Sequence, residues 1–100
     1  MNYEEFLKSV ENPAGGVPPK LPAPLEALWH ERTGDWDRAH RIVQAQEGAA
    51  SAWVHAYLHR REGDISNARY WYARAAKPEA AVAPDQEWEA LVRELLDDEA

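Results

Sequence analysis

The sequence predicts an all-α fold, in which antiparallel helix hairpins stack between an N-terminal and a C-terminal helix. Two observations predict this fold. Apolar residues recur at the i, i+3, i+4, i+7 spacing of an amphipathic helix near both ends of the 100-residue chain. Between the ends, the chain repeats itself after 29 residues, so that residues 27–43 align with residues 56–72. A chain of this length has the size of one domain, so we expect a single domain over residues 1–100.

The first element is a short helix over about residues 3–11, within an N-terminal segment of residues 1–12. Its apolar positions are Tyr3, Phe6, Leu7 and Val10. Asn2 precedes them and is a good N-cap, because its side chain can accept a hydrogen bond from the first turn. One face of this helix is apolar, so the helix needs a partner.

A proline-rich segment follows, PAGGVPPKLPAP at residues 13–24. Its five prolines remove backbone donors and fix φ, and Gly15-Gly16 adds a flexible joint. We expect no helix here but an extended linker or strap.

Two hairpins are predicted next, over residues 25–46 and 49–78. Each reads helix, Gly-Asp, helix, with the pairs Gly34-Asp35 and Gly63-Asp64 at equivalent positions. Glycine can take the left-handed conformation that ends one helix, and aspartate can cap the next by accepting from its free N–H groups. These aspartates are therefore expected to be structural.

The last element is a helix over residues 84–98 that begins at Pro84-Asp85, a suitable helix start. Its apolar positions repeat at helical spacing and are Trp88, Leu91, Val92, Leu95 and Leu96. Because repeat hairpins cannot bury their own end faces, we expect this acidic, amphipathic helix to cap the array.

The paired hairpins resemble tetratricopeptide repeats over roughly residues 25–78. Units of that family carry an Ala-x3-aromatic pattern, a further Ala and then a Pro on the second helix. Here that pattern is followed by Ala68, Tyr72, Ala75 and Pro78. The period of 29 residues is shorter than the family's usual 34 or so. The chain also resembles a group of short bacterial proteins that share its WVHAYLHR, EGD, NA and YWY segments, and this second resemblance supplies no activity.

The tetratricopeptide resemblance implies a concave face, lined by the first helix of each hairpin, that grips an extended peptide. The candidate groove residues are Trp53, Tyr57, Arg60 and Arg61, with the arginines meeting a carboxylate of the partner. The alternative is that the chain covers this surface itself, with Val17 and Leu21 of the proline-rich segment inserted.

Composition excludes several classes of function. The net charge of −7 argues against a nucleic-acid partner, although Arg60, Arg61 and Arg69 leave a local anion site open as an interpretation. The absence of cysteine excludes disulfides and thiolate metal sites. No signal peptide or membrane-spanning stretch is recognisable, so we expect no membrane partner and a cytoplasmic location. No nucleophile elbow or glycine-rich phosphate loop is present, so nucleophilic hydrolases and nucleotide binders are not expected.

The histidines are the residues that the repeat pattern does not explain. His55 and His59 stand at positions where the tetratricopeptide family places large core residues, and their i, i+4 spacing suits two ligands of one divalent metal. Counting from the turns predicts His40 near His55, Trp36 near His59, and all four histidines, including His30, in one layer between the helices. Neutral core histidines paired with carbonyls or tyrosine hydroxyls, metal ligands and catalytic groups all remain open.

The leading interpretation is a small interaction or scaffold module that binds a protein or peptide segment and needs no cofactor. No residue is assigned a catalytic role. The alternative is a metal-binding protein, extending to metal-dependent hydrolysis, in which His30, His40, His55 and His59 hold a divalent metal such as zinc.

Overall fold

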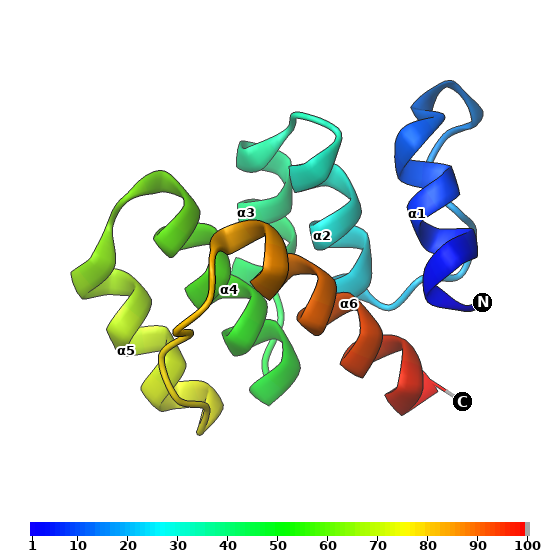
Figure 1. Cartoon of the computed structure of the whole chain (residues 1–100). Helices are drawn as coiled ribbons and strands as arrows, with labels where there is room; N and C mark the ends of the chain where they lie inside the picture. The colour runs from blue at the N-terminus through cyan, green and yellow to red at the C-terminus, as the bar shows by residue number, and fades with distance from the viewer. Residues whose placement is uncertain (100) are drawn as a thin grey trace.

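The computed structural model describes residues 1–99, so Ala100, the last residue of the predicted domain, lies outside the described residues. Over this range the chain forms six α-helices, one short 3-10 helix and no β-strand (Figure 1). They are α1 (Tyr3–Glu11), η1 (Pro13–Gly15), α2 (Ala23–Arg32), α3 (Trp36–Gln44), α4 (Ala49–Glu62), α5 (Ile65–Ala75) and α6 (Pro84–Glu99). The prediction of an all-α fold is confirmed. None of the helices in this range is both long and apolar enough to cross a membrane.

Two hairpins form the centre of the molecule, with α2 packed against α3 and α4 packed against α5 (Figure 1). Gly34 and Gly63 have φ angles of 102° and 90°, which lie in the left-handed region that favours glycine. Asp35 and Asp64 each accept a hydrogen bond from the backbone N–H three residues on, at 3.1 and 3.3 Å. The predicted turn chemistry is therefore confirmed in both hairpins.

The hairpins are joined through α3 and α4, which also pack against each other. Within the hairpins, Ala39 and Ala68 are almost fully buried, at 0% and 2% exposed. Side chains this small allow close approach of the paired helices. A short connection at Glu47-Gly48 turns the chain from α3 into α4, with Gly48 at a φ of 108°.

The N-terminal helix begins as predicted. The Asn2 carboxamide accepts from the backbone N–H of Glu5, and the Glu5 carboxylate accepts from the backbone N–H of Asn2, both at 2.9 Å. This capping box satisfies two donors that the first turn would otherwise leave free. The apolar face of α1 packs into the core, where Phe6 is fully buried.

The proline-rich segment differs from the prediction at both of its ends. Residues 13–15 form a 3-10 turn, and α2 begins at Ala23, with Pro24 inside its first turn. Proline is tolerated there because the first N–H groups of a helix have no intrahelical acceptor. Val17 and Leu21, the predicted inserts, are partly buried against the main core.

The C-terminal helix α6 lies across α2 and α4 and also reaches α1. Its Trp88 is 1% exposed and donates from Nε1 to the backbone carbonyl of Leu28 at 3.1 Å. The main core thus draws on α1, α2, α3, α4 and α6, and its largest members include Phe6, Leu28, Tyr57, Leu58, Trp88 and Leu91. Burying these apolar side chains is the main force that holds α6 against the hairpins.

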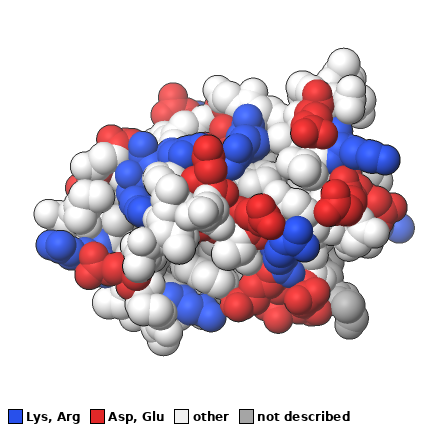
Figure 2. Space-filling view, viewed as in Figure 1, with Lys and Arg blue, Asp and Glu red and all other residues white. Residues whose placement is uncertain are grey.

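Ion pairs join the acidic C-terminal region to the basic middle of the chain, and Figure 2 shows acidic and basic side chains interspersed on one face. Arg60 pairs with Glu87, Arg61 pairs with Asp85, both at 2.7 Å, and Arg69 pairs with Glu79 at 3.0 Å. The local anion site proposed for these three arginines is therefore filled by carboxylates of the same chain.

Candidate metal centre

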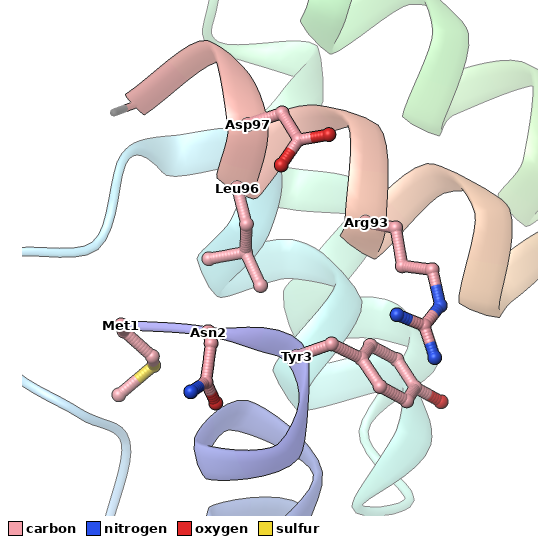
Figure 3. A pocket seen from close by; sticks show the side chains of 6 residues that line it. All are labelled: Met1, Asn2, Tyr3, Arg93, Leu96 and Asp97. Atoms are coloured by element: carbon pink, nitrogen blue, oxygen red, sulfur yellow. The ribbon is translucent and has the colours of Figure 1, made fainter.

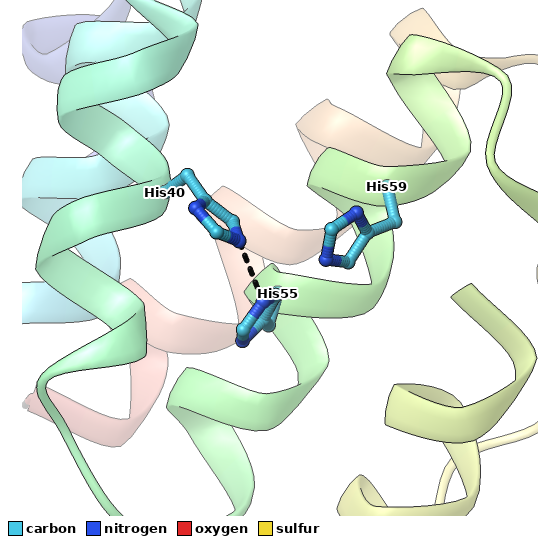
Figure 4. Close-up of side chains that lie close together, drawn as sticks. All are labelled: His40, His55 and His59. Atoms are coloured by element: carbon cyan, nitrogen blue, oxygen red, sulfur yellow. Dashed lines mark hydrogen bonds between the residues drawn. The ribbon is translucent and has the colours of Figure 1, made fainter. Parts of the chain in front are cut away.

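Three of the four histidines come together where the two hairpins meet. His40 projects from α3, and His55 and His59 project from successive turns of α4 (Figure 4). One nitrogen of each ring lies within 4.8 Å of the other two. The Nε2 atoms of His40 and His55 are only 3.0 Å apart, so one ring donates a hydrogen bond to the other. The predicted proximity of His40 to His55 is confirmed.

The backbone explains why these side chains meet. His55 and His59 are four residues apart, so they lie one above the other on one face of α4. The short connection before α4 brings α3 alongside, at the level where His40 faces His55. The predicted proximity of Trp36 to His59 is also confirmed, with ring centroids 6.0 Å apart.

Two indole rings flank the histidine cluster. Trp36 of α3 stacks on His40, with centroids 4.9 Å apart and planes 9° from parallel. Trp71 of α5 stacks on His55, with centroids 3.9 Å apart and an interplanar angle of 14°. The Trp36 ring is itself fixed, because its Nε1 donates to the backbone carbonyl of Leu58 at 2.8 Å. The rings of His40 and His55 are therefore each stacked against an indole, one from α3 and one from α5.

Burial governs the protonation of two of these rings. Desolvation, followed by the neighbouring His40 and His59, lowers the pKa of His55 from 6.5 to about 4. Desolvation and the nearby His59 also lower the pKa of His40. A charged imidazole would leave water and meet a like charge, so both rings are neutral at pH 7. Neutral imidazole is the form that can donate a lone pair to a metal.

The third histidine has a carboxylate partner. His59 Nδ1 lies 2.7 Å from Glu62 Oε2, one turn further along α4. When Nδ1–H donates to this carboxylate, the lone pair of the neutral ring is on Nε2. Histidines that bind metals are commonly held by such a second hydrogen bond, which fixes both the tautomer and the ring orientation.

The geometry of the cluster suits a small divalent cation. Around a tetrahedral zinc ion with N–Zn bonds of about 2.0–2.1 Å, ligand nitrogens are about 3.3 Å apart. The Nε2 atoms of His40 and His55, at 3.0 Å, are close to that spacing, and all three nitrogens lie within 4.8 Å of one another. Among the side chains of residues 1–98, the only buried nitrogens and oxygens without a hydrogen-bond partner belong to Arg32. The imidazole nitrogens that make no hydrogen bond therefore retain some contact with solvent.

His30 does not join this cluster. Its Nε2 lies 3.3 Å from Glu26 Oε2, one turn earlier on α2, and its ring stands edge-on to Trp29. The residue is 6% exposed, and its side-chain hydrogen bond and ring contact are made with Glu26 and Trp29 of its own helix. The expectation that all four histidines share one layer is corrected to three.

The four candidate groove residues do not line one common groove, and among them only Trp53 borders a depression between α4 and the loop before α6. Tyr57 is fully buried and donates to Glu31 at 2.7 Å. Burial, with the Glu31 carboxylate next, raises the pKa of its hydroxyl far above the usual value. Trp53 remains partly exposed beside Lys77, whose Nζ lies 4.3 Å from the centre of an indole ring.

The remaining two groove residues, Arg60 and Arg61, contact their own chain. Arg60 donates to Glu87 and to the backbone carbonyl of Val82, and Arg61 donates to Asp85. These partners come from α6 and the loop before it. The two arginines are therefore covered by this region, while Val17 and Leu21 of residues 13–24 pack against the core that includes Tyr57.

Glu87 and Trp71 are two residues that the sequence reading missed. Glu87 is 4% exposed and accepts hydrogen bonds from Arg60 and from the Tyr72 hydroxyl. Glu87 directly precedes Trp88, the first residue of the apolar stripe, and this position was the only sequence feature that indicated its burial. Trp71 stood among three consecutive aromatic residues, and nothing in that run marked it as the one that stacks on His55.

A hollow lies between the start of α1 and the last turns of α6 (Figure 3). It has a volume of about 310 Å³ and is lined by Met1, Asn2, Tyr3, Arg93, Leu96 and Asp97. Arg93 already pairs with Glu89 at 2.8 Å and lies over the ring of Tyr3. The hollow therefore gathers no set of free polar groups comparable to the histidine cluster.

No family model, no curated protein and no solved structure matches this chain.

Proposed function

We propose that this protein binds a divalent metal ion, such as zinc, through His40, His55 and His59 at the junction of its two helix hairpins. The observation that carries the proposal is the convergence of three imidazole nitrogens within 4.8 Å of one another. Two of the donors are an i, i+4 pair on α4, and the third comes from a different hairpin. Three histidines are a sufficient protein ligand set for zinc.

The contacts of the cluster also favour a metal over an ordinary polar core. A buried histidine in a polar core commonly pairs with a backbone carbonyl or a hydroxyl group. Here the nitrogens of His40 and His55 pair with each other, which satisfies one nitrogen of each ring. The lowered pKa values of both rings keep them in the neutral form that a metal requires. Glu62 supplies His59 with the carboxylate support that metal-bound histidines commonly have.

The test measures metal in protein that was produced and purified without an affinity tag. We expect one equivalent of zinc per chain after exposure to zinc and gel filtration, and its loss from the double variant His55→Ala/His59→Ala. The matched control is His30→Gln, because His30 is also buried on a helix but bonds only to Glu26. Circular dichroism checks that each variant remains helical. The proposal is wrong if the wild type and the double variant bind zinc equally, or if neither binds it.

We also propose a second function, the binding of a peptide segment, on one specific observation. An apolar depression of about 430 Å³ lies beside Trp53, between the loop before α6 and α6 itself. Its lining includes Pro78, Ala80, Val82 and Ala90, and Val82 is 46% exposed. Apolar concave surfaces of this kind are favoured sites for peptide side chains.

A peptide array tests the second function. Peptides selected by the wild type should lose binding to the variant Ala90→Arg, which fills the depression with a charged side chain. Arg74→Ala is a control, because Arg74 lies on α5 and does not line this depression. If the selected peptides bind Ala90→Arg as tightly as the wild type, the depression is not the peptide-binding site.

A further inference from the structure

The supply of donor groups around the histidine cluster determines what kind of metal site it can form. A structural zinc site has four protein ligands, whereas a site with three protein ligands keeps one position for water or another small ligand. A fourth protein donor beside His40, His55 and His59 would therefore close the site. Among the side chains described for residues 1–98, the carboxylates that group with one of these histidines, His59, are those of Glu62 and Asp64.

Glu62 is engaged on the outer side of the cluster. Its Oε2 lies 2.7 Å from His59 Nδ1, and its side chain is 37% exposed, whereas that of His59 is 7% exposed. The carboxylate therefore faces the solvent side of His59 and holds the ring by the nitrogen that the metal does not use. For Glu62 to become a ligand, it would have to give up this hydrogen bond.

Asp64 is engaged in the turn between α4 and α5. Its two carboxylate oxygens accept from the backbone N–H and the side-chain amide of Asn67, at 3.3 and 3.5 Å. This contact caps the start of α5, and a move toward the cluster would break it.

A third carboxylate, that of Asp37 one turn before His40 on α3, is near enough to act on the His40 ring by its charge, but it is not among the groups that meet at the three imidazole nitrogens. The aromatic neighbours offer no donor atom. Trp36 and Trp71 cover two of the rings with their flat faces. An indole N–H can only donate a hydrogen bond, and that of Trp36 already donates to Leu58. His40 is only partly buried, so the cluster retains one side toward solvent.

We infer that a metal ion held by His40, His55 and His59 keeps an open fourth position, which takes an exchangeable water molecule or a small anion. This inference rests on the proposed metal function and concerns the ligand class of the same site. The exchange is a simple substitution, in which an anion donates a lone pair to the metal and a neutral water molecule leaves.

The experiment uses the full chain loaded with cobalt(II) in place of zinc, with azide as the probe. Cobalt(II) absorbs visible light, and its bands change when a ligand in its coordination shell is exchanged. We expect a cobalt spectrum with one equivalent of metal, and a saturable change in that spectrum as azide is added. The variant Glu62→Gln keeps a side-chain oxygen that can accept from His59 but loses the carboxylate charge, so it should bind cobalt more weakly than the wild type. At a cobalt concentration that saturates both proteins, it should show the same azide-dependent spectral change as the wild type.

The outcomes separate the two proposals. If equilibrium dialysis finds no cobalt on the protein, the proposed metal function is wrong, and the inference of an open fourth position is wrong as well. If cobalt binds but azide leaves the spectrum unchanged, the metal function stands and the open position is wrong. If azide acts only on Glu62→Gln, Glu62 is the fourth ligand and the wild-type site is closed, which also overturns the inference. The double variant His55→Ala/His59→Ala controls for cobalt bound elsewhere and should show no azide-dependent change.

Discussion

The Nε2 atoms of His40 and His55 lie 3.0 Å apart, although the two residues belong to different helix hairpins. This contact lies at the packing interface of α3 and α4, through which the two hairpins are joined. A metal ion that replaces the shared proton would therefore bind both hairpins at once. Metal binding and the stability of the fold should be coupled for this reason.

Zinc should raise the free energy of unfolding. A ligand that binds only the folded state, at about 100 times its dissociation constant, stabilises a protein by about 2.7 kcal/mol. We expect an increase of this size in urea unfolding monitored by circular dichroism, and its reversal by a chelator. His55→Ala/His59→Ala should show no increase, and His30→Gln should keep it. An increase of the same size in the double variant would mean that zinc acts elsewhere.

Replacing Trp71 by alanine should weaken zinc binding about tenfold. Trp71 stacks on His55 with centroids 3.9 Å apart and so restricts the orientation of that ring. Hydrogen-bonded outer groups that orient a metal-binding histidine contribute about 10- to 100-fold to affinity, and we expect a stacked ring to act at the lower end of this range. Isothermal titration calorimetry measures the change. Tyr70→Ala is the matched control, because Tyr70 is the preceding residue of α5 and is 53% exposed. If both variants lose affinity equally, the effect belongs to α5 as a whole and the stacking explanation is wrong.

Replacing Glu87 by alanine should destabilise the protein by about 3 kcal/mol. The substitution leaves Arg60 without its partner at 2.7 Å and removes the acceptor of the Tyr72 hydroxyl, both in a partly or fully buried setting. Glu89→Ala is the control on the same helix. The pair of Glu89 with Arg93 is about half exposed, so its loss should cost about 0.5 kcal/mol or less. Urea unfolding measures both variants, and similar losses would contradict the role given to Glu87.

Local chemistry made much of this fold predictable. The turns at Gly34-Asp35 and Gly63-Asp64 depend on residues adjacent in the sequence, so the pattern and the structure agree. The proximity of His40 to His55 was predictable for a related reason. The connection between α3 and α4 is short, so counting back from it gives the level at which side chains face one another.

The same counting failed for His30. Distance from a turn gives a residue's level along the helix axis, but not the direction in which its side chain points around that axis. His30 points toward Glu26 on its own helix. The stacking of Trp71 on His55 depends on the rotation of α5 about its axis, for which the aromatic run gave no signal.

The position of α6 could not be derived from local pattern at all. Its apolar stripe predicted a helix that needs a partner, but the partner is fixed by long-range packing. Trp88 bonds to Leu28, which is sixty residues earlier in the chain. Because α6 and the loop before it engage Arg60 and Arg61, the groove predicted at these residues is not open.

In the absence of metal, stability should fall as the pH is lowered from about 6.5 to about 4. The pKa of His55 is about 4 in the folded protein and 6.5 in its unperturbed state, so between these values the unfolded chain binds more protons. Protons therefore favour unfolding in this window, and the stabilising contribution of the neutral ring is fully present only above it. The lowered pKa of His40 acts in the same direction. Solvent contact at the cluster weakens this dependence on pH, so we expect the free energy of unfolding to fall by about 2 kcal/mol across the window.

Urea unfolding in the presence of a chelator, repeated at several pH values across this window, measures the effect of the His55 proton. Carboxylates begin to titrate near the lower end, so the wild type is compared with His55→Gln in the same buffers. The variant keeps the carboxylates but has no proton to gain at this position, and its stability should therefore depend less on pH. Because the comparison isolates one ring, parallel curves for the two proteins would mean that His55 can accept a proton in the folded state as easily as in the unfolded chain. The cluster would then be open enough to solvate a charged imidazole, in conflict with the burial of His55 at 3% exposure.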